Sequence, residues 1–289
     1  MKRKIYVTLF GGLGNQLFQY ACAVNLARSI NAKLIVDDIS GFIFDGKFKR
    51  NLSLPNNFKI NKANILEIFI LILIMILKKI FFNKKLFIKF TKFIILDETK
   101  EKKYIKNFDS LFKNFTTVYL IGFFQSDLYF LKNKNFILKK ILENKIQNKK
   151  LLKLKKKITR NSLMIGIRVF EEAPKKNMYN FGGVEKFSFY NPNKSEFKKK
   201  LKKIYIFTTA NDKIIRDNVK FEYKIINRNN GYFGSDFENL LLMSHFNNYI
   251  ISNSTYYWWA AYLANYKNKI IVRCSKKFTN KDTILKSWK

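Results

Sequence analysis

Cysteine and acidic residues are scarce in this sequence of 289 residues. The only cysteines, Cys22 and Cys274, lie in a predicted first helix and near a predicted last strand. This separation excludes a disulfide framework or a paired metal site and favours a reducing compartment. Lys and Arg number 56 against 20 Asp and Glu, for a formal net charge of +36. The scattered lysines indicate compositional drift with a weak preference for anionic membrane surfaces, and no motif for binding nucleic acid accompanies them.

Long hydrophobic runs are also missing. The most apolar stretch, 65–77, is shorter than the about 20 apolar residues that cross a bilayer. Two interpretations stay open: a buried core helix, or an interfacial helix that lies with the Lys and Phe residues of 78–90 in an anionic headgroup layer. The N-terminus enters a predicted strand without the regions of a signal peptide. We therefore expect a cytoplasmic protein, either free or peripheral on the inner face of the membrane.

The opening of the chain predicts a βαβ unit of an α/β domain. A strand-like run, 4–9, leads into a helical pattern from Leu17, and 33–36 is typical of a second strand. Between strand and helix lie three glycines, Gly11, Gly12 and Gly14. Glycines permit a sharp turn and close approach of a ligand, and the N-terminus of the helix suits a phosphate; Asn15 adds a neutral amide. A tight turn without a ligand is the alternative, and the spacing departs from the dinucleotide fingerprint, because Gln16 holds its third glycine position.

The second half repeats the α/β pattern. Five strand-like runs separated by helical or loop segments favour a mostly parallel sheet: 163–168, 204–208, 223–226, 249–252 and 270–273. The Lys-rich segment 139–157 predicts an exposed amphipathic helix that leads out of the first domain. We therefore expect an N-terminal domain over 1–159 and a C-terminal domain over 160–289.

The string GGLGNQLFQYA, from Gly11 to Ala21, resembles the N-terminal signature of glycosyltransferase family 11, the bacterial α-1,2-fucosyltransferases. Three further stretches are similar to family segments: 118–130, 205–212 and 238–263. The resemblance implies two Rossmann-like domains facing a cleft, the GT-B-like architecture. It also implies an inverting transfer of L-fucose from GDP-β-L-fucose, as donor substrate, to a glycan hydroxyl. That hydroxyl would be a galactoside 2-OH of a surface polysaccharide such as an O-antigen, with a free or lipid-linked acceptor.

Transfer of the sugar leaves negative charge on the β-phosphate, which a metal, cationic side chains or backbone N–H groups can stabilise. The sequence has no Asp-x-Asp, and Asp236 and Glu238 look like acids that cap a helix. A metal-free mechanism without a cofactor then needs an arginine. Arg168, at the end of an apolar strand, suits phosphate oxygens, and the alternative is an ordinary surface arginine.

The segment around Arg168 is similar to the family motif His-x-Arg-Arg-x-Asp-Tyr, with departures. Gly166 stands at the His position, Val169 replaces the second Arg, and the following positions hold Phe170, Glu171 and Glu172. These departures leave the donor open. The alternatives are the same scaffold with another nucleotide sugar, or a catalytically inactive cationic protein that binds membranes or glycans.

Other polar residues follow predicted strands. Asp212 either binds the ribose or base of the donor or caps a helix, and the resemblance assigns donor binding to the turn Asn253, Ser254 and Thr255, which could equally cap its helix. By the resemblance, Asn15 orients the acceptor or the departing phosphate. Gln125, Ser126 and Asp127 are expected either at a ligand-binding strand end or as a helix cap. Trp258 and Trp259 are expected to pack in the core, and His245 is not expected to be the catalytic base.

Overall fold

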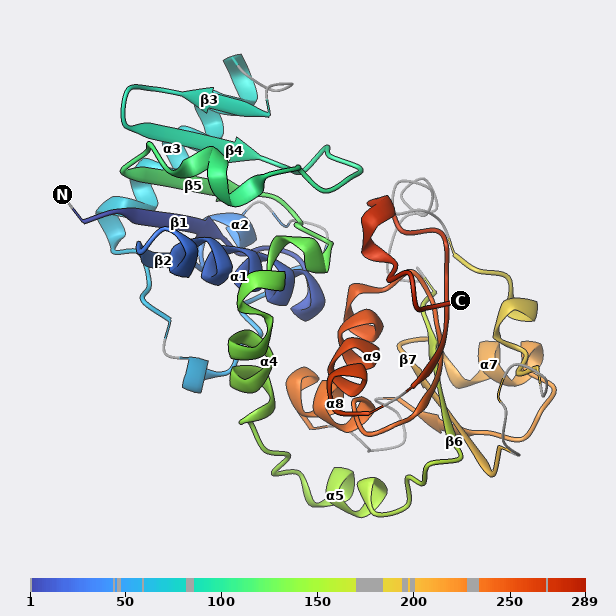
Figure 1. Cartoon of the computed structure of the whole chain (residues 1–289). Coiled ribbons are helices and arrows are strands. Elements are labelled where there is room, and N and C mark those ends of the chain that lie inside the picture. Colours follow the sequence, from blue (N-terminus) through green and yellow to red (C-terminus); the bar gives the residue numbers. More distant parts are fainter. Residues whose placement is uncertain are drawn as a thin grey trace. The chain divides into compact units, whose positions relative to one another are not determined.

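The computed structural model describes residues 2–43, 45, 48–58, 60–81, 86–169, 184–193, 197, 201–227, 234–268 and 270–289. The chain divides into two compact units (Figure 1). Unit 1 comprises 1–141 and 280–283, and unit 2 comprises 142–279 and 284–289. The division between residues 141 and 142 falls inside the Lys-rich segment 139–157, all of which the sequence-based boundary at residue 160 assigned to the first domain.

Unit 1 is built on a sheet of five strands. They are β1 (Lys4–Thr8), β2 (Lys33–Asp37), β3 (Phe87–Lys89), β4 (Phe93–Asp97) and β5 (Thr117–Ile121). The order is β2-β1-β5-β4-β3, and every pairing is parallel except the antiparallel β3–β4 hairpin. The carboxyl ends of β1, β2, β4 and β5 therefore meet at one edge of the sheet.

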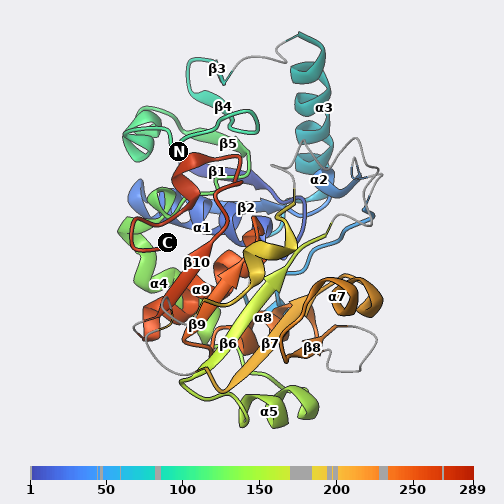
Figure 2. The ribbon, with the colours of Figure 1, turned by 90° about the vertical axis from the view of Figure 1, so that its right-hand side faces the viewer.

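Helices cover both faces of this sheet (Figures 1 and 2). The helices of unit 1 are α1 (Leu13–Ser29), α2 (Ser40–Ile43), α3 (Ile65–Phe81) and, near its end, α4 (Lys134–Leu142), which extends one residue into unit 2. One face carries α1, which is buried along nearly its whole length; most of its own residues are apolar or small. The other face carries α3, where Ile68 and Leu71 pack with Tyr6, Ile95 and Tyr119 of the strands. Short 3-10 turns complete the unit: 56–58, 108–112, 127–129, 131–133 and 281–283.

Unit 2 is built on a second, fully parallel sheet. Its strands are β6 (Ser162–Ile167), β7 (Lys203–Thr208), β8 (Lys224–Ile226), β9 (Asn248–Ile251) and β10 (Ile271–Cys274), in the order β10-β9-β6-β7-β8. Its helices are α5 (Lys149–Lys155), α7 (Asp212–Asn218), α8 (Asp236–Met243) and α9 (Thr255–Lys267), with a 3-10 turn at 187–190. Each of the five strand runs expected from the second half is present.

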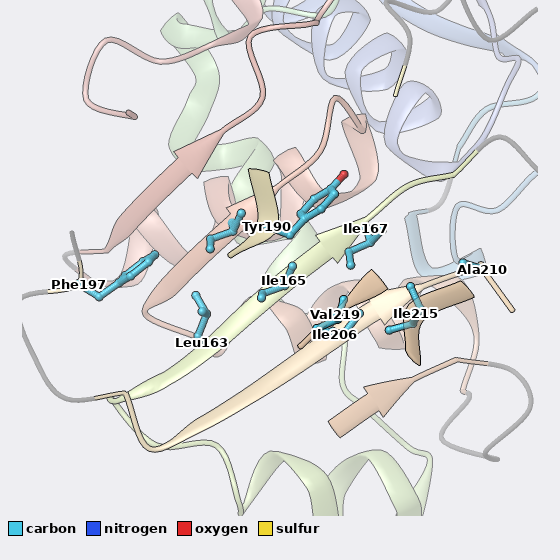
Figure 3. Close-up of a cluster of buried hydrophobic side chains, with 10 residues drawn as sticks. Leu163, Ile165, Ile167, Tyr190, Phe197, Ile206, Ala210, Ile215 and Val219 are labelled. Carbon is cyan, nitrogen blue, oxygen red and sulfur yellow. The ribbon is translucent and has the colours of Figure 1, made fainter. Parts of the chain in front are cut away.

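The central strand β6 divides its side chains between two cores. Leu163, Ile165 and Ile167 lie on one face, in a cluster with Ile206 of β7 and Ile215 of α7 (Figure 3). Because side chains alternate along a strand, residues 164 and 166 lie on the opposite face. Gly166 contacts α9 there, since a Cβ built on it would fall against Tyr257. The alternation thus places position 166 against α9 and leaves Arg168 at the end of the strand.

Three features differ from the sequence-based expectations. Residues 87–89 form β3 of a hairpin, where the sequence suggested a basic, apolar segment. The single helix expected over 139–157 is two helices, because Asn148 caps a new helix by accepting from the N–H groups of Lys150 and Leu151. The core-helix interpretation of 65–77 is wrong in part, since only one face of α3 is buried. Across the described residues, no helix has the length and apolarity needed to cross a membrane.

Candidate functional site in two halves

The glycine loop of unit 1 lies at the carboxyl edge of its sheet. Gly11 has φ +75°, a backbone conformation that residues with a side chain rarely adopt. A Cβ there would lie 2.7 Å from the side-chain nitrogen Nδ2 of Asn15. Gly12 precedes α1 as its N-cap, and Gly14 is buried in the first turn. Gly12 has no side chain to cap the helix and the first turn of α1 holds no acid, so no carboxylate of that turn offsets the positive end of the helix dipole.

Two buried glutamines of α1 hold the loop in place. Gln16 donates to the carbonyls of Gly11 (2.9 Å) and Asn51 (3.0 Å) and accepts from the Ser53 N–H (2.8 Å). Gln19 accepts from the N–H of Phe10 (3.1 Å) and donates to a carbonyl that follows β5 (3.1 Å). Both glutamines satisfy backbone groups where the chain leaves the sheet. Gln16 and Gln19 of the signature therefore act on the loop backbone, a role that the sequence analysis did not assign.

Asn15 contacts the turn that follows β5. Its Oδ1 accepts a hydrogen bond from Gln125 Nε2 at 3.1 Å, and both residues are half-buried. Ser126 caps the next 3-10 turn by accepting from the Leu128 N–H, so the capping interpretation of Ser126 is confirmed. The contact brings Asn15 and Gln125 together at the edge where open α/β sheets bind ligands.

A buried carboxylate shapes the same turn. Glu98, directly after β4, is 1% exposed, and its Oε2 accepts from the N–H groups of Phe123 (2.8 Å) and Phe124 (3.0 Å). Phe124 has φ +49°, a strained conformation outside glycine, and two successive N–H groups in such a turn form a concave anion site. Burial raises the pKa of Glu98 from 4.5 to about 8, although these N–H donors act to lower it. Glu98 was missed by the sequence analysis because nothing local distinguishes it.

Glu98 predicts a pH-dependent stability. Its pKa in the folded protein is about 8, against an ordinary 4.5, so the folded state holds a proton that the unfolded state releases. The free energy of unfolding should therefore fall as pH rises through this window, and Glu98→Gln should remove up to about 5 kcal/mol of that fall. The measurement is urea unfolding at about pH 5 and about pH 9. The exposed control Glu143→Gln should parallel the wild type; a Glu98→Gln variant that does so would contradict the assignment.

In unit 2, Arg168 lies at the carboxyl edge of the parallel sheet. It is half-buried, directly follows β6, and its guanidinium donates to the carbonyl of Asn253 at 3.4 Å. Asn253 follows β9, which pairs with β6, so the two strand ends are neighbours. Its amide also donates to the Lys277 carbonyl (3.4 Å), and Lys277 forms an ion pair with Glu185 at 3.3 Å. Arg168 thus contacts the turn after β9, and that turn in turn contacts the backbone of the segment after β10, whose Lys277 is neutralised by Glu185; the sequence analysis identified only Arg168.

The turn Asn253, Ser254 and Thr255 precedes α9. Asn253 and Ser254 are buried, and Thr255 is half-buried. Ser254 occupies the N-cap position, yet its side chain makes no cap hydrogen bond, and the first turn of α9 holds no acid. The structure therefore does not bear out Ser254 as a side-chain cap. A helix N-terminus whose own first turn carries no carboxylate is favourable to an anion.

Asp212 was expected to bind the donor or to cap a helix. The cap of α7 is instead Asn211, whose side chain accepts from the Lys213 N–H at 2.9 Å. Asp212 accepts a hydrogen bond from the Asn227 side chain, which follows β8. Its carboxylate therefore lies between the ends of β7 and β8, at the same edge as Arg168. Glu238 was correctly expected as a capping acid, since it forms a capping box with Ser235.

Gly166, at the His position of the family motif, meets Tyr257 of α9 in space. A Cβ on Gly166 would lie 2.5 Å from Cγ of Tyr257, so no larger residue fits at 166 while the tyrosine ring stays. The Tyr257 hydroxyl donates to the carbonyls of Phe207 (2.9 Å) and Ile167 (3.3 Å), which are the ends of β7 and β6. Burial raises the pKa of Tyr257, and the nearby charge of Arg168 acts in the opposite direction. The tyrosine therefore fills the space above Gly166 and binds the strand ends beside Arg168.

The structure also places the tryptophan pair and His245. Trp258 and Trp259 are fully buried, and Trp258 stacks on Tyr262 with ring centroids 4.4 Å apart, so the packing interpretation is confirmed. His245 bonds the Leu241 carbonyl at 2.7 Å and precedes β9, at the edge of the sheet opposite to Arg168. Phe170, Glu171 and Glu172 of the arginine motif lie outside the described residues. Where the structure describes the chain, no three His, Cys, Asp or Glu side chains are placed to hold a metal ion.

Comparison with known proteins identifies the family. The family model described as "Glycosyl transferase family 11" matches residues 4–289. Among curated proteins, the chain is 28% identical to the O-antigen biosynthesis glycosyltransferase WbnK of Escherichia coli, covering 98% of this chain and 99% of that protein. It is 27% identical to an alpha-1,2-colitosyltransferase of Escherichia coli, covering 91% and 88%.

Among solved structures, a mutant of Arabidopsis thaliana FUT1 in complex with GDP matches with a TM-score of 0.50 and 14% identity, covering 95% of this chain and 70% of that one. This likeness shows the fold alone. Because the family model spans nearly the whole sequence, the chain belongs to glycosyl transferase family 11.

Proposed function

We propose that this protein transfers L-fucose from GDP-β-L-fucose to a glycan hydroxyl, with inversion and without a metal ion. The acceptor is the 2-OH of a galactoside in a surface polysaccharide. The observation that carries the proposal is the edge of unit 2, where Arg168 contacts the turn before α9. The relatives support the process, since one is named for O-antigen biosynthesis and the other for α-1,2 transfer.

The chemistry follows from the charge that develops. The acceptor oxygen forms a bond to the anomeric carbon and gives its proton to water or to a phosphate oxygen of the departing GDP. The bond from that carbon to the β-phosphate oxygen breaks, and GDP leaves. Arg168 and the N-terminus of α9 neutralise the leaving diphosphate, with Asn253, Ser254 and Thr255 around it. Asp212, at the same edge, binds the ribose or base.

Unit 1 supplies the acceptor side of the proposal. The loop of Gly11, Gly12 and Gly14 admits the substrates, and Asn15, held by Gln125, orients the acceptor or the departing phosphate. This mechanism requires the two units to face a common cleft in the GT-B manner, with an N-terminal domain over 1–159 and a C-terminal domain over 160–289. The protein is cytoplasmic in this proposal, and a lipid-linked acceptor would place it at the inner face of the membrane.

A second candidate is the same transfer from another nucleotide sugar. It is favoured by Gly166 and Tyr257, which pack together beside Arg168 where the family motif has a histidine at position 166. It is also favoured by a relative that is named a colitosyltransferase. A third is a cationic protein without transferase activity.

Calorimetry of the metal-free protein with GDP, GDP-fucose, GDP-mannose and UDP-glucose tests the donor. We expect GDP-fucose to bind at least about tenfold more tightly than UDP-glucose, a difference of about 1.4 kcal/mol. Preference for another sugar would favour the second candidate. Absence of nucleotide binding in a folded protein would reject both transferase proposals and favour the third.

A further inference from the structure

Helix α3 exposes a row of large apolar side chains. Its inner face, with Ile68 and Leu71, packs on the sheet of unit 1. Its outer face carries what we call the α3 stripe, whose members are between 41% and 66% exposed: Leu66, Phe69, Leu73, Ile76, Leu77 and Ile80. The spacing of three and four residues keeps them on one side of the helix. Figure 2 shows α3 in full beside β3 and β4.

The helix cannot turn to bury this stripe. Glu67 accepts a hydrogen bond from the Tyr6 hydroxyl at 2.6 Å, and near the other end Lys78 forms a buried ion pair with Asp97. These two ties fix the rotation of α3 on the sheet. A helix of 17 residues is about 25 Å long, so the stripe is a contiguous apolar surface of a size that marks an interaction site.

Charge selects the partner for this surface. Two copies of a chain with a net charge of +36 repel each other, which disfavours a dimer through the stripe. Nucleic acid matches the charge and not the apolar side chains. An anionic bilayer matches both, and the neighbouring hairpin adds Phe90, which is 58% exposed, between the exposed Lys89 and Lys92.

We propose that the α3 stripe docks this protein onto bilayers that contain anionic phospholipid. The helix then lies in the plane of the membrane, with the stripe among the upper acyl chains and the lysines at the headgroups. The inference extends the proposed function, because it gives a lipid-linked acceptor a surface on which to meet the enzyme. Docking itself requires neither donor nor acceptor.

The test is co-sedimentation with vesicles of phosphatidylcholine, with and without phosphatidylglycerol. The stripe variant is Phe69→Gln, Leu73→Gln and Leu77→Gln, which keeps the charge and uses a residue that favours helix. The matched control changes three exposed leucines elsewhere: Leu111→Gln, Leu131→Gln and Leu152→Gln. We expect the stripe variant to bind the anionic vesicles about 100-fold more weakly than wild type and the control to match wild type. Added salt should weaken wild-type binding without abolishing it.

Three results would overturn the inference. Equal binding by the wild type and the stripe variant would assign the attraction to scattered lysines alone. Failure of the wild type to bind anionic vesicles would exclude docking, and a wild-type dimer that the stripe variant lacks would assign the surface to a second copy. Circular dichroism and calorimetry with GDP establish that each variant is folded and competent. A wild type that binds vesicles and no GDP would reject the proposed function while leaving the docking inference intact.

Discussion

Replacing Arg168 by alanine should weaken the binding of GDP about 100-fold and lower the rate of transfer by about 10²–10³. The guanidinium is half-buried at the carboxyl end of β6, beside the turn before α9. A planar cation there can donate two parallel hydrogen bonds to phosphate oxygens. Its effect should exceed that of any other single charge at this edge, because negative charge grows on the β-phosphate as the sugar leaves.

The matched control is Arg160→Ala. Arg160 is exposed and lies just before β6, at the opposite end of the same strand, so this variant removes an equal charge from the far edge. We expect it to bind GDP as the wild type does. Arg168→Lys keeps the positive charge but loses the planar guanidinium that donates two parallel hydrogen bonds. Compared with Arg168→Ala, it should therefore restore part of the GDP affinity and a smaller part of the transfer rate. Unchanged GDP binding by a folded Arg168→Ala variant would indicate that Arg168 is an ordinary surface arginine without a role in the donor site.

The second large effect concerns packing between Gly166 and Tyr257. In Gly166→Ala the new Cβ would meet the tyrosine ring at 2.5 Å, and β6 cannot retreat because β7 and β9 hold it on both sides. We expect a loss of about 3 kcal/mol in the free energy of unfolding. Tyr257→Ser removes the ring and its hydrogen bonds to two strand ends, at a cost of about 3–5 kcal/mol.

The double variant should cost less than the sum of the single ones, by about 2 kcal/mol, since the new Cβ enters space that the ring has left. Urea unfolding of the four proteins measures this coupling. Gly166→Ala combined with Tyr262→Ser is the control, because Tyr262 is equally buried on α9; that pair should be additive. Additivity in both pairs would show that positions 166 and 257 do not interact. Coupling predicts that Gly166→His is tolerated only with Tyr257→Ser.

The family, the α/β class and the positions of most strands could be predicted from the residues alone. Strand and helix patterns are local, because the alternation or periodicity of apolar residues can be recognised within a short window and glycines mark the turns between them. The eleven residues from Gly11 to Ala21 sufficed for the resemblance that the family model then confirmed. The burial of at least one of the two tryptophans was also predictable, because large aromatic side chains favour the core. The burial of both was not, since neighbouring helix positions point in different directions.

Which side chains meet in space could not be predicted, because it depends on the packing of elements that are distant in the chain. The β3–β4 hairpin escaped notice because its strands are short and follow an apolar, lysine-rich stretch. The exposed side of α3 could not be chosen from a helix that is apolar all round, since the sheet decides which face it covers. Glu98 and the pair of Gly166 with Tyr257 owe their properties to residues distant in sequence. Burial and steric contact are properties of the assembled core, and no local pattern encodes them.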